Sequence, residues 1–277
     1  MNVIGIDIGG TKTSIGIIDI KAGQIISKII IPSKKFKSDK KNLENIISTT
    51  IDVINNKNIK NIGIGVPELI NNEGIIKGSY NFSWYNKQLF NFFPKKYKVI
   101  VDSDVRCHLR AEKFYGHGKK LKNFIYINIG TGLSYSQFKN NQIYSGANGY
   151  AIHFASSKIT LYNPLNFKKI SLIPEDYYSG KGIMTFLKKY KGSKKQNIIL
   201  KNIAESLGSL IGNLVNSVDP ELIVMGGGVV NNNLIFRNLL IKYSRNYMLS
   251  AESKKMKILM SKLKDDTGLL GAAAVFK

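Results

Sequence analysis

The sequence has little cysteine, arginine and acidic charge, and these shortages exclude several kinds of protein. Cys107 is the single cysteine among 277 residues, so the chain can form neither an intramolecular disulfide nor a zinc site built from several cysteines. No apolar run approaches the roughly 20 residues that a membrane span needs. Residues 1–10 are typical of a strand and a turn rather than of a signal peptide, so we expect a cytoplasmic protein without a membrane partner.

Acidic residues are scarce relative to basic ones, because 41 Lys plus Arg face 18 Asp plus Glu and give a formal net charge of +23. Such an excess first suggests nucleic acid. However, Arg is the preferred side chain for bidentate contacts with bases and phosphates, and it is rare here. Lys, Ile and Asn come from A- and T-rich codons, so genome composition can supply the bias. We therefore expect a solvated lysine surface and no specific nucleic-acid partner.

The hydrophobic pattern predicts an α/β chain with an internal duplication. Apolar, β-branched runs predict strands over residues 3–8, 13–20, 24–31, 61–66, 98–101, 124–129, 133–139, 142–145 and 222–225. Helical spacing predicts helices over residues 42–54, 104–114, 203–218 and 268–276, and a polar loop over 191–196. A strand, a glycine turn and another strand occur near the N-terminus and again near residue 124. This repetition favours two similar α/β units that face each other across a cleft.

Three glycine-rich turns carry the clearest chemical signal. The first is Asp7-Ile8-Gly9-Gly10-Thr11-Lys12-Thr13, the second Asn128-Ile129-Gly130-Thr131-Gly132, and the third Gly226-Gly227-Gly228. Glycines let the backbone approach a phosphate, and successive N–H groups can cradle it. The hydroxyls of Thr11 and Thr13 would add donors, and Asp7 could hold Mg²⁺ through water. Each of the first two turns lies between strands, unlike a Walker loop, and two such copies half a chain apart favour phosphate binding over ordinary hairpins.

Taken together, these segments resemble the ROK family (repressor, open reading frame, kinase) of the actin-like ATPase and sugar-kinase superfamily. The resemblance runs in order over nearly the whole chain. Its segments are residues 7–13, 63–67, 81–84, 102–104, 112, 116, 130–132, 219–228 and 268–272. It implies two ribonuclease-H-like (actin/hexokinase-like) domains facing a central cleft. We expect one domain over residues 1–104 with a returning C-terminal helix at about 265–277, and the other over 105–264.

The resemblance also implies an ATP-dependent sugar kinase that uses Mg²⁺. Asp104 would take the proton from a sugar hydroxyl as this hydroxyl attacks the γ-phosphorus. The acceptor site would consist of Asn81, Ser103, Asp104, His153 and Glu175. The nucleotide and its phosphates would bind at Asp7, Gly9, Gly10, Thr11, Lys12, Thr13, Gly130, Thr131, Gly132, Gly226, Gly227 and Gly228. Family members are commonly dimers, so a homodimer is possible here.

Several positions depart from the family pattern. Glu68 stands where Gly is usual, and Ser103 where Asn is usual. His153 and Ser156 occupy the places of the Glu and His in the family's Glu-x-Gly-His element. Residues 167–174 replace the family's zinc loop and contain no cysteine, so we expect no zinc site. The acceptor is then a different sugar, with an anionic group facing His153 or Arg106, or a loosely bound hexose, or the acceptor site has been lost.

Three functions remain open. A sugar kinase is the first, with polyphosphate as a lesser alternative to ATP as donor. A repressor is the second, but such members carry a helix-turn-helix domain ahead of the first phosphate motif, and here that motif begins at Asp7. A nucleotide-binding protein without acceptor chemistry is the third.

Overall fold

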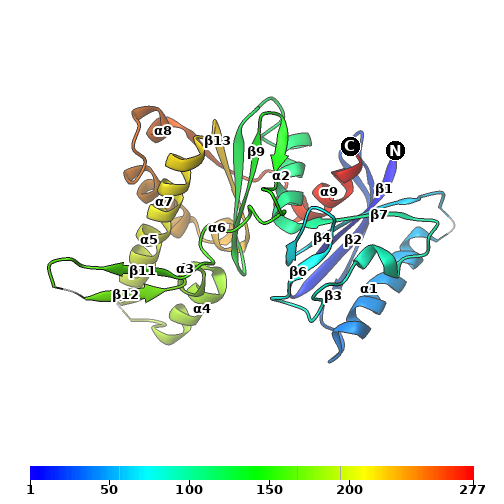
Figure 1. Cartoon of the computed structure of the whole chain (residues 1–277), viewed down its shortest axis with the longest axis horizontal. Helices are drawn as coiled ribbons and strands as arrows, with labels where there is room; N and C mark the ends of the chain where they lie inside the picture. Colours follow the sequence, from blue (N-terminus) through cyan, green and yellow to red (C-terminus); the bar gives the residue numbers. More distant parts are fainter. Residues whose placement is uncertain (56, 167, 194) are drawn as a thin grey trace. The chain divides into compact units, whose positions relative to one another are not determined.

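The computed structural model describes all residues except 56, 167 and 194. It divides into two compact units (Figure 1). The first comprises Met1–Lys122, Ser136–Ile152 and Ser261–Lys277, and the second Asn123–Tyr135 and His153–Met260. The expected domain boundary between residues 104 and 105 stays a prediction.

A five-stranded sheet in the order β3-β2-β1-β4-β7 forms the centre of the first unit. Its strands are β1 (Asn2–Ile8), β2 (Lys12–Asp19), β3 (Gln24–Pro32), β4 (Asn61–Val66) and β7 (Lys98–Ser103). The first three strands form an antiparallel meander, while β4 pairs in parallel with β1 and β7. This arrangement confirms the three strands predicted over residues 3–31, and its parallel pairs bring the ends of β1, β4 and β7 to one edge of the sheet.

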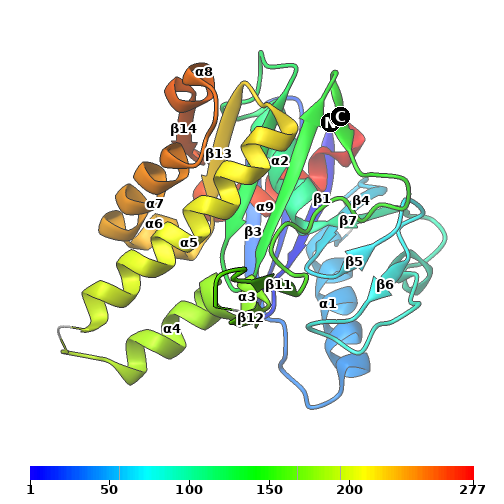
Figure 2. The same ribbon diagram turned by 60° about the vertical axis from the view of Figure 1, so that its left-hand side comes forward.

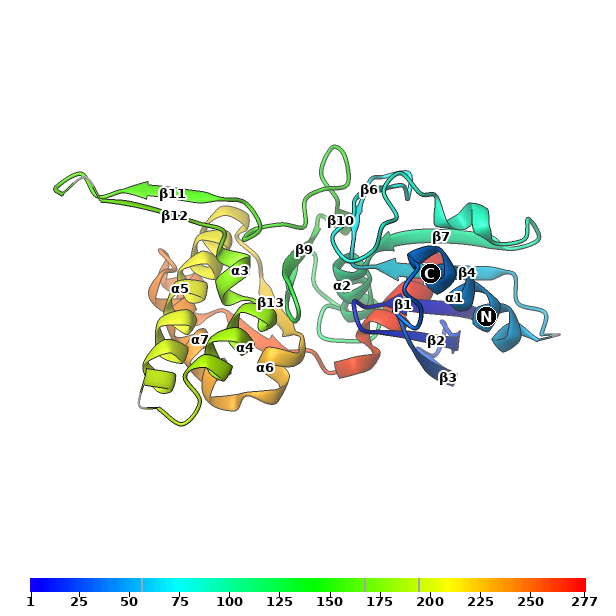
Figure 3. The same ribbon diagram turned by 90° about the horizontal axis from the view of Figure 1, so that it is seen from below.

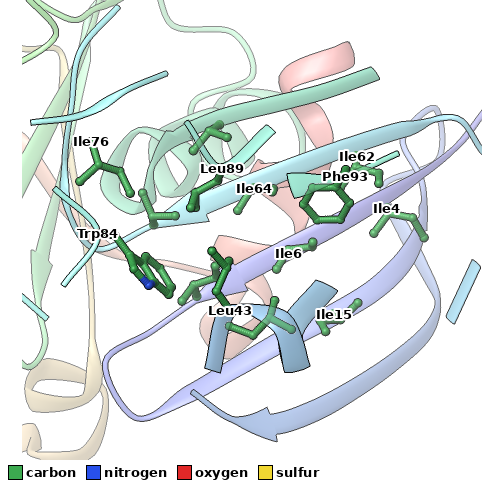
Figure 4. Close-up of a cluster of buried hydrophobic side chains, with 14 of the residues drawn as sticks. Ile4, Ile6, Ile15, Leu43, Ile62, Ile64, Ile76, Trp84, Leu89 and Phe93 are labelled. Carbon is green, nitrogen blue, oxygen red and sulfur yellow. The ribbon is translucent and has the colours of Figure 1, made fainter. Parts of the chain in front are cut away.

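Side chains alternate between the two faces of this sheet along β1 and β4, and different helices pack on each face. The isoleucines at positions 4, 6, 62 and 64 face α1 (Asp39–Ile54) and form a core with Leu43 (Figure 4). The other face carries glycine, because a Cβ at Gly63 would overlap the carbonyl oxygen of Ala272. There α2 (Asp104–Phe114) and α9 (Thr267–Ala273) pack closely together. The short helices η2 (Lys264–Asp266) and η3 (Ala274–Phe276) flank α9.

The sequence pattern predicted no helix or strand in the connection between β4 and β7. This connection contains β5 (Leu69–Ile70), β6 (Ile76–Gly78) and η1 (Leu89–Phe92). Trp84 is fully buried in this connection and belongs to the same apolar core, as Figure 4 shows. The ring of Phe82 stacks on it at a centroid distance of 4.1 Å. Residues 80–84 are therefore fixed against the core although they form no helix or strand.

The second five-stranded sheet has the order β10-β9-β8-β13-β14. Its strands are β8 (Phe124–Ile129), β9 (Leu133–Lys139), β10 (Gln142–Tyr144), β13 (Leu222–Gly226) and β14 (Lys257–Met260). β13 pairs in parallel with β8 and β14. The strand–turn–strand pattern therefore occurs in both sheets, as the duplication predicted.

Helices α3 (Pro174–Tyr178), α4 (Gly180–Lys189), α5 (Lys195–Val218), α6 (Gly228–Asn232), α7 (Leu234–Asn246) and α8 (Ala251–Lys255) complete the second unit. α5 and α7 lie side by side (Figure 2). Among the described helices, α5 alone is long and apolar enough to cross a membrane by length and composition. Its buried residues, such as Leu207 and Ile211, pack in the second core.

One expectation about this part of the chain needs correction. The loop expected over residues 191–196 ends sooner, because α5 begins at Lys195; residue 194 lies outside the described residues. The segment in place of a zinc loop contributes β12 (Lys169–Leu172), which pairs with β11 (Ile159–Tyr162) in an antiparallel hairpin. Figure 3 shows this hairpin projecting from α3 and α5.

Candidate functional site

The first glycine turn joins β1 to β2 and is closed by its own backbone. Gly9 N–H donates to the carbonyl of Lys12 at 2.9 Å, and Thr11 and Lys12 are exposed. Thr13 is fully buried, and its Oγ1 lies 2.7 Å from Ser33 Oγ. The turn therefore presents Thr11 and Lys12 to a ligand, whereas the Thr13 hydroxyl is already engaged inside the unit.

Asp7 is the last but one residue of β1 and lies on the face that α9 covers, where a Cβ at Gly268 would overlap its carboxyl group. Burial raises the pKa of Asp7 to about 6, although the positive charges of Lys12 and Lys28 oppose the rise. Among the described residues, no group donates a hydrogen bond to this carboxylate. It is therefore a poorly compensated negative charge, which is what a divalent cation binds.

Asp104 begins α2, directly after the N-cap residue Ser103. Its Oδ1 accepts from Val105 N at 2.6 Å and from Ser103 Oγ at 3.4 Å. Burial and then the negative charge of Asp7 raise the pKa of Asp104 to about 7, and Glu68 adds a smaller contribution. A carboxyl group with this pKa is poised to take up a proton near neutral pH. Asp7 and Asp104 thus interact electrostatically, and both belong to the first unit.

A buried ion network supports the start of α2. Asp102 Oδ1 accepts from Arg106 Nε at 2.5 Å and from Ser103 N at 2.8 Å, and Asp102 Oδ2 accepts from Arg110 Nη2 at 2.5 Å. Burial favours the neutral acid, but the two guanidinium groups outweigh it and hold the pKa of Asp102 below its usual range. Arg106 also donates to the carbonyl of Gly149 at 2.6 Å and is only 4% exposed. It is therefore committed to the fold, which corrects its expected role as partner of an anionic acceptor.

Asn81 lies beside the first glycine turn. Its Nδ2 donates to Pro67 O at 2.8 Å, and its Oδ1 would lie 3.2 Å from a Cβ built on Gly10. The structure therefore brings Asn81 close to a predicted phosphate-binding glycine. Its backbone and those of its neighbours donate to Glu68, a contact that sequence reasoning missed.

The second glycine turn joins β8 to β9. Gly130 N donates to Gly132 O at 3.1 Å, and Gly180 N, at the start of α4, donates to Gly130 O at 2.8 Å. Glu175 Oε1 accepts from Leu133 N at 2.8 Å, so this predicted acceptor residue lies against the turn. Glu175 N in turn donates to Ala155 O at 2.9 Å, which ties α3 to the segment after His153.

The third glycine run ends β13 and begins α6. Gly227 has a φ of +101°, a conformation that suits glycine, and a Cβ at Gly226 would overlap the hydroxyl of Tyr126. A pocket of about 810 Å³ lies beside this run. Its lining includes Gly130, Thr131, Gly180, Lys181, Gly228 and Asn232. The second and third predicted turns therefore share one pocket, although Gly132, Gly226 and Gly227 are not part of its lining.

His153 is exposed and pairs locally. Its Nδ1 lies 3.1 Å from Ser156 Oγ, so the two residues that replace the family's Glu and His contact each other. Partial burial lowers the pKa of His153, and the negative charge of Glu175 opposes this. Among the described residues, no group of three or more His, Cys, Asp and Glu is arranged to hold a metal ion.

Two sets of residues escaped prediction from sequence. Glu68 was noticed only as a departure from Gly, and its three backbone donors lie 12–14 residues away. Lys181 and Asn232 face the pocket from α4 and α6. For α4, the available signal was Ser179, whose Oγ accepts from Gly182 N and caps this helix.

Comparisons with a family model, with related sequences and with solved structures agree on one family. A model of the ROK family matches residues 3–158 and 165–277. The glucokinase of Thermotoga maritima is 23% identical over 310 residues, covering 100% of this chain and 98% of that protein. A xylose repressor of Caldicellulosiruptor bescii is 24% identical over 318 residues, covering 99% of this chain and 77% of that protein. A ROK family glucokinase from Streptomyces griseus, solved with glucose and AMPPNP, has a TM-score of 0.84 at 20% identity and 99% coverage of both chains. This last similarity confirms the predicted two-domain actin/hexokinase-like fold.

Proposed function

The chain belongs to the ROK family, and on that basis we propose that it transfers the γ-phosphoryl group of ATP to a hydroxyl group of a sugar or sugar derivative. The similarity to a glucokinase supports sugar kinase activity. Because the relatives also include a xylose repressor, an experiment has to test whether this chain is an enzyme. Asp104 carries the proposal, because it combines partial burial, a raised pKa and a fixed position at the start of α2.

Asp104 would act as general base. Its Oδ1 already accepts from Val105 N and Ser103 Oγ, so we assign the proton transfer to Oδ2. The acceptor hydroxyl would lose its proton to Oδ2 while its oxygen forms the bond to the γ-phosphorus, and the bond to the leaving ADP oxygen breaks. A positioned base contributes about 10²–10⁴-fold to such a step. Asn81 would hold another hydroxyl of the acceptor through its Oδ1.

The pocket of the second unit is the proposed nucleotide site. Thr131 would offer its backbone N–H group to a phosphate oxygen, Gly130 would let the backbone approach the phosphates closely, and the ammonium group of Lys181 would add positive charge. The apolar side chains of Ile183 and Met184 line the same pocket and would contact the base. S. griseus glucokinase was solved with AMPPNP, which supports ATP as the donor.

Mg²⁺ fits the donor set around Asp7. This carboxylate is partly buried, has a raised pKa and accepts no hydrogen bond from the described residues, so a hydrated divalent cation would supply the missing countercharge. When bound, Mg²⁺ neutralises charge on the phosphates as it develops during transfer. Asp7 would hold it through water, while Lys12 and Thr11 would contact the phosphates from the exposed part of the turn.

A phosphorylation screen tests the proposal. Purified protein would be incubated with Mg²⁺ and either ATP or polyphosphate, together with neutral, amino and acidic sugars, and formation of sugar phosphate would be followed by mass spectrometry. We expect ATP-dependent phosphorylation of at least one sugar. Tight ATP binding without turnover of any acceptor would refute kinase activity.

A nucleotide-binding role without acceptor chemistry is the second candidate. The local pairing of His153 with Ser156 favours it, because the carboxylate that family members use to bind sugar is missing there. Calorimetry with ATP and with the same sugars would distinguish the two candidates, since this role predicts nucleotide binding alone. For either role we propose a cytoplasmic protein, a possible homodimer, without membrane or specific nucleic-acid partners.

A further inference from the structure

Residues 80–84 are an irregular segment in which every backbone N–H has a partner. Tyr80 N donates to Glu68 Oε2 at 2.5 Å, and Asn81 N and Phe82 N donate to Glu68 Oε1 at 2.8 and 2.9 Å. Ser83 N donates to Asp39 Oδ2 at 2.7 Å, and Trp84 N to Phe82 O at 2.8 Å. Two carboxylates from distant parts of the chain therefore fix this segment.

Glu68, which accepts three of these hydrogen bonds, is almost completely buried, and glutamate is rarely buried to this extent. It is 3% exposed, and burial raises its pKa, while the three backbone donors and then Lys34 act in the opposite direction. Three successive N–H groups that converge on one carboxylate form the kind of concave anion site that often binds a free anion. Here the chain fills that site with its own side chain.

The anchored segment carries the residue assigned to the acceptor. Asn81 is held by its backbone to Glu68 and by its side-chain Nδ2 to Pro67, the residue just before Glu68. With Nδ2 engaged, Oδ1 is the atom that lies near Gly10. The stacked rings of Phe82 and Trp84 hold the segment against the apolar core. Lys34 Nζ lies 5.1 Å from the centre of the Phe82 ring.

We propose that Glu68 is a positioning residue that fixes Asn81 beside the first glycine turn, so that Asn81 Oδ1 accepts a hydrogen bond from one hydroxyl of the acceptor. The proposal rests on the proposed kinase function and extends it to acceptor recognition. Glu68 touches neither substrate nor nucleotide; it acts through the backbone of residues 80–82. ATP binding in the second unit should not depend on it.

The test compares Glu68→Ala and Glu68→Gln with the wild type and with Glu44→Ala, which removes an exposed carboxylate from α1 in the same unit. KM for the acceptor, KM for ATP and kcat would be measured with a sugar found in the screen. Hydrogen exchange of residues 80–82 would be followed in parallel by mass spectrometry.

Glu68→Ala should raise the acceptor KM by about 10- to 100-fold, because three backbone donors lose their partner, with ATP KM changed less than about twofold. Amide exchange at 80–82 should accelerate by at least about tenfold. Glu68→Gln should lie between these values, since its amide oxygen can still accept from Asn81 N and Phe82 N while its NH₂ group faces Tyr80 N–H. Glu44→Ala should match the wild type in every measurement.

An unchanged acceptor KM in Glu68→Ala would overturn the proposal, and so would unchanged exchange at residues 80–82. If the wild type phosphorylates no sugar, the kinase function fails, and exchange at 80–82 decides the anchoring by itself. If the Ala variant does not fold, as judged by Trp84 fluorescence, the Gln variant decides, and a wild-type acceptor KM together with wild-type exchange in it counts against the proposal.

Discussion

Replacing Asp104 by Asn separates the chemical role of this carboxylate from its cost to stability. The substitution keeps an oxygen that can accept from Val105 N but removes the charge and the basic atom. Without a base, turnover should fall by about 10²–10⁴-fold while nucleotide binding persists. The same change should stabilise the first unit at neutral and alkaline pH.

The size of this stabilisation follows from the pKa. Burial and the charge of Asp7 raise the pKa of Asp104 from 3.8 to about 7 in the folded protein. The folded state therefore binds the proton more tightly than the unfolded state does. The stability that this proton contributes is fully present below the unfolded pKa of 3.8. It is lost progressively as pH rises from there through the folded pKa of about 7. The loss corresponds to about 2 kcal/mol at pH 5 and about 4 kcal/mol at pH 8, which Asp104→Asn should recover.

Denaturation by urea at pH 5 and pH 8, without Mg²⁺ or nucleotide, measures this difference. Trp84 is the single tryptophan and is buried in the same unit as Asp104, so its fluorescence reports unfolding of the relevant unit. Asp52→Asn, on the exposed side of α1, is the matched control and should change stability little at either pH. If Asp104→Asn gains no more stability at pH 8 than at pH 5, the electrostatic argument is wrong. Wild-type turnover in this variant would refute the assignment of the base.

The remaining predictions concern the other two aspartates of this region. Asp7→Asn removes a negative charge that raises the pKa of Asp104, so the Asp104 carboxyl should titrate at lower pH in a ¹³C NMR titration of the metal-free protein; an unchanged midpoint would contradict the coupling. Asp102→Asn leaves Arg106 and Arg110 buried without their countercharge and should lower the free energy of unfolding by about 3–5 kcal/mol at neutral pH. Because the pKa of Asp102 is lowered, this difference should shrink as pH falls below the unfolded value, and a pH-independent difference would count against it.

The elements that were predictable carry their information locally. β1, β2 and the turn between them follow from β-branched residues on either side of a Gly-Gly pair, and α2 follows from a polar start before an apolar periodic run. Position 104 at the start of a helix is likewise a local property. α7 was missed although its signal was present, since Asn233 caps it and Phe236 and Leu240 share one buried side.

What could not be predicted depends on contacts between residues far apart in sequence. Nothing near Glu68 indicates that its carboxylate accepts from residues 80–82, because that segment has neither helical nor strand periodicity. Arg106 looked available for an anion until the fold placed the carbonyl of Gly149, 43 residues later, against its Nη1. The shared pocket of the second and third glycine turns also required the fold, because α4 and α6 complete it.

The distribution of charge links the lysine excess to these buried acids. The chain has only 18 acidic residues, yet Asp7, Glu68 and Asp104 lie in one unit with pKa values raised by burial. Lysines limit this rise: Lys12 and Lys28 act on Asp7, and Lys34 acts on Glu68. These positive charges thus lower the cost of keeping carboxylates ionised inside the unit. Burial and the charge of Asp7 raise the pKa of Asp104 to about 7, above the value of about 6 for Asp7, whose rise is opposed by Lys12 and Lys28; a pKa near 7 suits a proton acceptor near neutral pH.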